Sequence, residues 1–342
     1  MKRLADMVLS GIVAPSWWTK QVKRQTQEQL NSRLPGVEKF LIDNVMAYFY
    51  SETTKDQWGM WDDFPNIAPP FESFWMEGFY PSYASPELSE RSNALLEGLR
   101  SIGSSPAIGV GYWVQSHKIY EDREWWGWAM TALPFIPGLD GKVGGPTGMV
   151  TLPIDKHGRP TKQGDLPYGL AKDHIRRWGG IEAAVGGGIP AGEEFEQLAK
   201  RKGWSDDDIE KWKDYFVTQT VAGFLPFMLA LSFIHCKNVS QSEVSLTPRR
   251  HRKQTELGSS RYTYKVLDIN PMKKVLKTEG QIDNVGLKKA LHICRGHFAT
   301  YTEDAPLFGR VTGTFWKEQH LRGDPRAGVV EKDYCVHPPM GG

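Results

Sequence analysis

The spacing of apolar positions predicts helices in several parts of the chain. Residues 4–9, 20–50 and 87–100 have helical spacing, and the second stretch changes from polar to apolar after the Pro35-Gly36 break. A longer helix is expected to begin at Ser205, which can cap it ahead of three acidic residues, to bend at Pro226 and to end near residue 236. Its apolar segment 221–231 is too short to span a bilayer, so we interpret it as a core helix.

Alternation of apolar and polar positions predicts short strands at 71–76, 106–115, 261–269, 291–298 and 311–316. Residues 148–163 have the pattern of a hairpin that turns at 156–158. The stretch 137–192 is rich in Gly and Pro, and its glycine runs lack the Gly-Lys-Ser/Thr of a phosphate-binding loop. The predicted fold class is α+β: a helix-rich N-terminal body with short strands and Gly-rich loops, and a small antiparallel sheet in a basic C-terminal domain.

Charge is unevenly distributed along the chain, although the formal net charge of the 342 residues is only +2. Residues 247–342 contain 17 Lys and Arg against 10 Asp and Glu, whereas residues 1–246 contain 25 against 30. A basic end on an acidic body indicates an anionic partner, with RNA the first candidate, although a solvated surface gives the same count. We divide the chain into a body (1–245), a basic linker (246–260) and a C-terminal domain (261–342).

The linker has a run of cations that is either an RNA-contacting arm or a solubilising loop: Arg249, Arg250, Arg252 and Lys253. Three Cys are an odd number in a long chain, so no disulfide framework is expected and a reducing cytoplasm is the simplest location. The N-terminal residues lack the pattern of an export signal. No cofactor is expected.

The C-terminal domain contains the groups that metal-independent RNA cleavage requires. Such cleavage needs a base for the 2′-hydroxyl, an acid for the leaving oxygen and cations for the phosphate. His297 and His320 are the candidate acid–base pair. Tyr301 would position the RNA or donate a proton, and Arg295 and Arg322 would bind the phosphate. A role of the same residues in binding RNA or protein without catalysis remains the alternative.

Two further residues, Arg310 and Trp316, are candidates for RNA contact, although a core position suits Trp316 equally well. In a strand of period two, His292 and Cys294 lie on the face opposite His297 and Arg295. A zinc site formed by His292 and Cys294 with the two candidate catalytic histidines is the rival chemistry. Their spacing matches no standard zinc finger, and we predict no metal.

The body contains most of the chain's 13 Trp and is the candidate peptide-recognition unit. Large aromatic rings anchor short peptides well, but most buried aromatic residues simply form core. The candidate peptide-binding residues are Phe71, Phe74, Trp75, Trp125, Trp126 and Trp128.

Several motifs together resemble a family of phage and mobile-element proteins that includes a type V-A anti-CRISPR inhibitor. They are APPFESF at 68–74, CKNV at 236–239, the segment 262–269, and a C-terminal series: HICRGHF at 292–298, Tyr301, LFG at 307–309, TGTFW at 312–316 and His320 with Arg322-Gly323. The resemblance follows most of the chain in order and is strongest in the C-terminal segment.

The resemblance implies an anti-CRISPR protein of the host bacterial cytoplasm that lowers production of a type V CRISPR nuclease. It would recognise the nascent polypeptide of the nuclease and cause loss of the message being translated. Its partners would be that nascent chain and the mRNA or the ribosome, with no membrane. Two alternatives stay open: a metal-independent ribonuclease, and a non-enzymatic protein that engages the ribosome or a host protein and recruits a host ribonuclease. A phage DNA-associated protein is less favoured, because no helix-turn-helix is recognisable.

Overall fold

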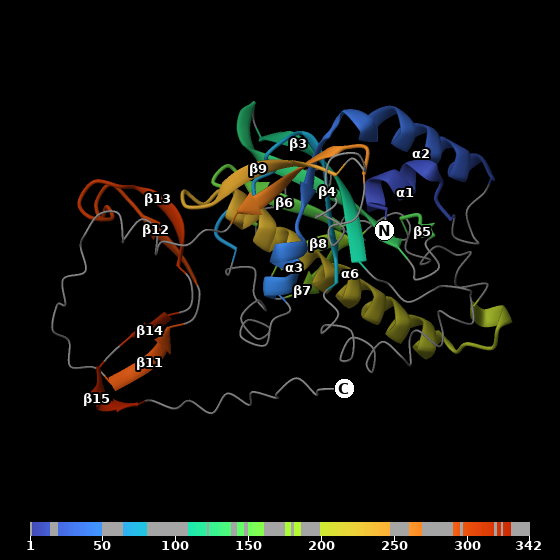
Figure 1. Cartoon of the computed structure of the whole chain (residues 1–342). Coiled ribbons are helices and arrows are strands. Elements are labelled where there is room, and N and C mark those ends of the chain that lie inside the picture. The colour runs from blue at the N-terminus through green and yellow to red at the C-terminus, as the bar shows by residue number, and fades with distance from the viewer. Residues whose placement is uncertain are drawn as a thin grey trace, which may run out of the picture. The chain divides into compact units, whose positions relative to one another are not determined.

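The computed structural model describes fifteen segments of the 342 residues (Figure 1): 2–13, 20–49, 64–80, 109–121, 123–137, 142–146, 150–160, 175–178, 181–185, 199–246, 260–268, 290–294, 297–317, 320–322 and 324–329. The chain divides into two compact units. The first comprises Met1–Leu231 and Ser242–Val266, and the second comprises Ser232–Gln241 and Leu267–Gly342. The helix expected at 87–100 lies outside the described residues.

A ten-stranded mixed sheet organises the first unit. Along its path the strands are β7 (Ile175–Trp178), β8 (Ile181–Val185), β6 (Val150–Asp155), β4 (Glu124–Pro137), β3 (Gly109–Glu121), β2 (Ser73–Phe79), β1 (Glu38–Leu41), β10 (Thr263–Asp268) and β9 (Ser240–Ser245). The two-residue β5 (Val143–Gly144) pairs with β4 off this path. Strand β1 is parallel to both of its neighbours, whereas the pairs from β2 to β7 are antiparallel.

The helices in the described segments are α1 (Leu4–Ser10), α2 (Lys20–Arg33), α3 (Asp43–Phe49) and α6 (Asp206–Ile234), with a 3-10 turn at Leu34–Gly36. The predicted start of α6 is confirmed: Ser205 Oγ accepts a hydrogen bond from Asp208 N at 3.1 Å, and Asp208 Oδ2 accepts one in return from Ser205 N. Residues 224–231 are buried, as expected of a core helix. Within the described residues, none of the helices has the length and apolar character needed to cross a membrane.

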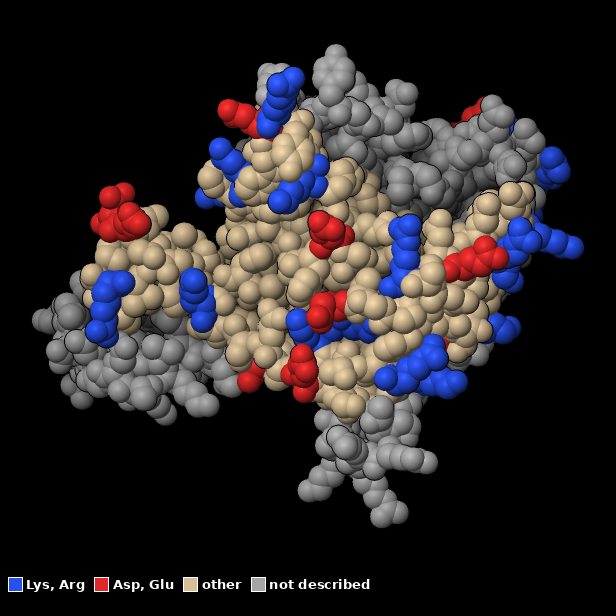
Figure 2. Space-filling model, turned by 90° about the horizontal axis from the view of Figure 1, so that it is seen from above, with Lys and Arg blue, Asp and Glu red and all other residues tan. Residues whose placement is uncertain are grey.

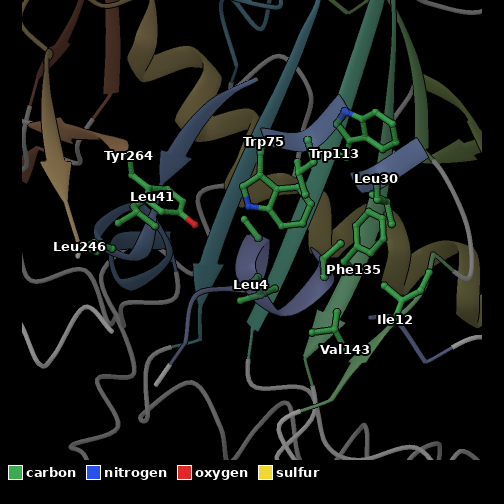
Figure 3. Packing of buried hydrophobic residues seen from close by; sticks show 13 residues of the cluster. Leu4, Ile12, Leu30, Leu41, Trp75, Trp113, Phe135, Val143, Leu246 and Tyr264 are labelled. Carbon is green, nitrogen blue, oxygen red and sulfur yellow. The ribbon is translucent and has the colours of Figure 1, made fainter. Parts of the chain in front are cut away.

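The two faces of the sheet pack against different helices (Figure 1). Neighbouring residues of a strand point to opposite faces, so Tyr112 and Trp113 of β3 pack on opposite faces of the sheet. Tyr112 packs against Phe224 and Phe227 of α6, with ring centroids 5.0 and 4.2 Å apart. Trp113 belongs to the cluster that includes residues of α1 and α2, together with Trp75 of β2 and Phe135 of β4 (Figure 3).

A buried carboxylate ties α1 to the centre of the sheet. Glu77 of β2 accepts hydrogen bonds from the backbone N–H groups of Leu4 and Ala5 at 3.2 and 2.9 Å, and from the Trp75 indole at 2.6 Å. Arg3, itself buried, forms a bidentate ion pair with Asp43 and lies 3.9 Å from Glu77. The side chain of Glu77 therefore caps the first turn of α1 from inside the core.

The body contains more sheet than the sequence predicts. Of the helix expected over 20–50, the second half instead forms β1 and the short α3, because strands β2 and β10 supply hydrogen-bond partners on both sides of β1. Strand β10, which the sequence analysis places in the C-terminal domain, pairs with β1 in this sheet. The predicted turn at 156–158 is present, with Gly158 at φ 82° and a bridge from Ile154 to Pro160.

The described residues of the second unit include the short strands β11 (Ala290–Cys294), β12 (His297–Tyr301), β13 (Gly313–Lys317), β14 (His320–Arg322) and β15 (Asp324–Val329). The predicted small antiparallel sheet is confirmed by the β12–β13 hairpin. One face of this hairpin packs its Phe298 and Trp316 rings against Phe233 at the end of α6, with centroids 4.8 to 5.5 Å apart. Asn238 fixes the hairpin further by bonding both N and O of Trp316.

Candidate functional site

The opposite face of the β12–β13 hairpin carries three groups able to handle protons or phosphate. His297 pairs directly with Lys317, and Tyr301 lies four residues further along the same strand and therefore on the same face. His297 is exposed, and Tyr301 and Lys317 are half-buried. Lys317 Nζ lies 5.3 Å from the centre of the Tyr301 ring, and the buried Phe315 ring lies 5.9 Å from that ring.

These side chains combine an imidazole, an ammonium and a phenol on one face. Imidazole groups exchange protons near neutral pH, a Lys ammonium attracts phosphate oxygens, and a Tyr hydroxyl can donate or accept a hydrogen bond. Lys317 was not among the residues singled out from the sequence. The signal was present, because an antiparallel pairing of residues 297–301 with 313–317 places position 317 opposite His297.

His297 and His320 lie on two separate ladders. Strand β14 pairs with β11 so that Cys294 is opposite His320 and His292 is opposite Arg322, whereas His297 pairs with Lys317 in the β12–β13 hairpin. Residues 295–296 and 318–319, which connect the two ladders, lie outside the described residues. The pairing of His297 with His320 as acid and base therefore stays a prediction.

The remaining RNA-binding candidates are placed differently. Arg310 is exposed in the turn between β12 and β13. Trp316 is 1% exposed and belongs to the aromatic core, so its ring is not available for stacking on a base. Arg322 and His320 are located by their backbone pairing alone. Arg295 and the linker cations lie outside the described residues: Arg249, Arg250, Arg252 and Lys253.

The described segments contain no group of three His, Cys, Asp or Glu residues arranged to hold an ion. The one described Cys with a placed side chain is Cys236, whose thiol is buried and donates to Ser232 O at 3.4 Å. Burial raises the pKa of this thiol to about 12, so the thiol stays protonated at neutral pH.

Two of the candidate peptide-binding residues belong to the core instead. Phe74 and Trp75 are fully buried, on opposite faces of β2. Trp75 also approaches Gly111 so closely that its ring leaves no room for a Cβ there. A peptide on the surface cannot contact either residue without opening the sheet.

The other aromatic candidates reach the surface of the first unit. Trp125 is 38% exposed and packs edge-on against Trp128, with centroids 4.9 Å apart, and Trp126 is half-buried. Tyr120, which was not singled out from the sequence, is 59% exposed and pairs directly with Trp125. We call Tyr120, Trp125 and Trp128 the hairpin aromatic patch.

Phe71 lies on the same side of the sheet as this patch. Its ring is 37% exposed and 6.2 Å from that of Phe40, and Lys265 Nζ lies 4.9 Å from its centre. Lys118 is placed similarly at 5.8 Å from the Trp125 ring. Exposed rings with cations beside them suit a peptide that carries apolar and acidic side chains.

The chain was also compared with known proteins. No protein-family model, curated protein or solved structure matches it.

Proposed function

We propose that this protein acts on RNA through the hairpin face that carries His297, Tyr301 and Lys317, and that its target is the message of a type V CRISPR nuclease during translation. The first unit would hold the nascent polypeptide on its exposed aromatic residues. The family resemblance of the motifs motivates the choice of target. The observation that carries the RNA chemistry is the direct pairing of His297 with Lys317 on the face opposite the aromatic core.

The proposal assigns a role to each side chain. Lys317 binds the phosphate and stabilises the negative charge that develops during cleavage. His297 removes the 2′-hydroxyl proton or protonates the leaving oxygen, and Tyr301 positions the phosphate between them. His320, the second candidate acid or base, lies on β14 and is located by the pairing of that strand with β11.

Cleavage by the purified full-length chain tests the chemistry. The substrate is a labelled single-stranded RNA in the presence of EDTA, and the expected products carry 2′,3′-cyclic phosphate ends. His297→Ala should lower the rate on the order of a hundredfold or more, the usual contribution of a positioned acid or base. His157→Ala, at an exposed histidine in the turn after β6, is the matched control and should leave the rate unchanged. Equal rates for both variants would exclude His297 from catalysis.

The choice of target needs a second experiment. Translating ribosomes would be given a nuclease message, the same message recoded with synonymous codons, and a version whose first codons are frameshifted. Recognition of the nascent chain predicts that loss of the message survives recoding and disappears on frameshifting. Loss that follows the nucleotide sequence instead would contradict the peptide role of the first unit.

Recruitment of a host ribonuclease remains the second candidate function. The burial of Trp316 leaves the hairpin without one of its predicted RNA contacts, and recruitment does not need that contact. It predicts message loss in cell extract and none with purified ribosomes and protein.

A further inference from the structure

Helix α2 presents almost its whole surface to solvent. Of its 14 residues only Leu30 is buried. Gln27 anchors the helix to the end of α1, because its side chain accepts a hydrogen bond from Ile12 N and donates one to Val8 O, each at 3.0 Å. Gln27 and the buried Leu30 lie on the attached side of the helix, whereas Lys20, Lys23 and Arg24 are exposed.

The exposed surface of α2 is basic. It carries Lys20, Lys23, Arg24 and Arg33 against a single acid, Glu28. Arg24 and Glu28 form an ion pair at 3.7 Å, with both side chains about 70% exposed. Within the described segments, the other three cations have no ion-pair partner. Figure 2 shows Lys and Arg side chains along the ridge at the right, where α2 lies.

Helix stability does not explain the positions of Lys20 and Lys23. The N-terminal end of a helix carries a partial positive charge, so acids stabilise its first turn and cations destabilise it. The first turn of α2 contains no acid and begins with Lys20, with Lys23 and Arg24 following. The sequence thus places cations where they disfavour the helix, which indicates that they serve binding rather than folding.

Three of these cations are also arranged along one side. Residues three and four apart are neighbours on a helix, so Lys20, Lys23 and Arg24 form one stripe, whereas Gln21, Gln25 and Gln29 form another. From Lys20 to Arg24 this stripe extends roughly 6 Å at 1.5 Å per residue, and the long Lys and Arg side chains reach beyond it. The phosphates of a single strand repeat every few ångströms and so offer negative charges at a comparable spacing.

We propose that α2 is an RNA-binding surface of the first unit, with the stripe of Lys20, Lys23 and Arg24 contacting the phosphate backbone of a single strand. This site is separate from the β12–β13 hairpin and does not depend on the chemistry proposed there. It supplies the acidic N-terminal body with its own contact to RNA.

A binding assay on 2′-O-methyl RNA tests this site, because such RNA cannot be cleaved through its 2′-oxygen. Fluorescence anisotropy with the full chain and a labelled strand should show that Lys20→Gln/Lys23→Gln/Arg24→Gln binds on the order of tenfold to a hundredfold more weakly. The slope of log affinity against log salt should fall by about 2, since three phosphate contacts on a single strand contribute about 0.7 each.

The matched control lies on the same helix. Gln21→Glu/Gln25→Glu/Gln29→Glu changes the net charge by the same three units on the other stripe, and it should retain most of the affinity and the salt slope. Equal losses in both triple variants would reduce the effect to overall charge and overturn the proposal. The proposal would also be overturned if polyglutamate displaced the labelled RNA as effectively as unlabelled RNA does. That result would indicate an acidic peptide as the occupant.

The His297→Ala variant separates this proposal from the preceding one. It should bind the uncleavable strand with wild-type affinity. If His297→Ala loses binding while the α2 triple variant keeps it, RNA binds at the hairpin and not on α2.

Discussion

Glu77 is a carboxylate held out of water by the first turn of α1 and the indole of Trp75. Burial raises its pKa from 4.5 to about 7, and the nearby Arg3 guanidinium and the hydrogen bonds from Trp75 and Ala5 offset only part of this effect. The folded protein therefore keeps a proton on Glu77 between pH 4.5 and about 7, where the unfolded chain releases it.

This difference in proton binding predicts how stability varies with pH. The free energy of unfolding should fall as pH rises from 4.5 towards 7, by up to about 1.4 kcal/mol per pH unit from this one group, and level off above that. Urea unfolding of the wild type and Glu77→Gln across this range measures it. The difference in the free energy of unfolding between the wild type and Glu77→Gln should change with pH. For Glu124→Gln, a change at an exposed position, the free energy of unfolding should vary with pH as it does in the wild type. Parallel curves for Glu77→Gln would mean that the buried carboxyl does not hold its proton.

Sequence reasoning identified residue chemistry better than residue position. The aromatic content of 71–76 was evident, yet nothing in the sequence distinguished Phe71, which reaches the surface, from Phe74 and Trp75, which do not. Those outcomes depend on which strands flank β2, and that information comes from distant parts of the chain. Lys317 was missed for the same reason, because its importance comes from its partner on β12.

At the scale of single elements, charge changes in α2 should shift Tm in opposite directions at the two ends of the helix. Replacing Lys20 and Lys23 by Gln removes cations from the positive end of the helix and should raise Tm by about 1–4 °C. Arg33→Gln removes a cation from the negative end and should lower Tm slightly. Differential scanning calorimetry distinguishes the two shifts. A decrease for the Lys20/Lys23 variant would show that these cations stabilise the fold and would weaken the case for a binding role.

Elements with strong local signals were predicted well, and those that depend on partners were not. The cap at Ser205, the core segment of α6 and the turn at 156–158 follow from residues close together in sequence. By contrast, β1 is four residues long and lies in a stretch with helical spacing, so only its parallel neighbours make it a strand.

At the scale of the whole molecule, the division into two units predicts separable stability. Trp316→Ala removes the central ring of the Phe233–Phe298–Trp316 cluster and should cost about 3–5 kcal/mol, as large aromatic truncations in cores do. Hydrogen exchange should then show faster exchange over 297–317 and unchanged protection in β2, β3 and β4. Loss of protection in all of these strands would show that the two units unfold as one.

The place of β10 in the large sheet has a consequence for the order in which the chain can fold. Strand β1 ends at Leu41, yet its partner on one side begins only at Thr263. During synthesis the early strands emerge first, and that edge of β1 has no partner until most of the chain has been made. Pairing between such distant segments is slow, and an open strand edge invites association with other chains. Fragments that stop before residue 263 should therefore aggregate rather than yield a shorter body, and the first unit is best studied in the intact chain.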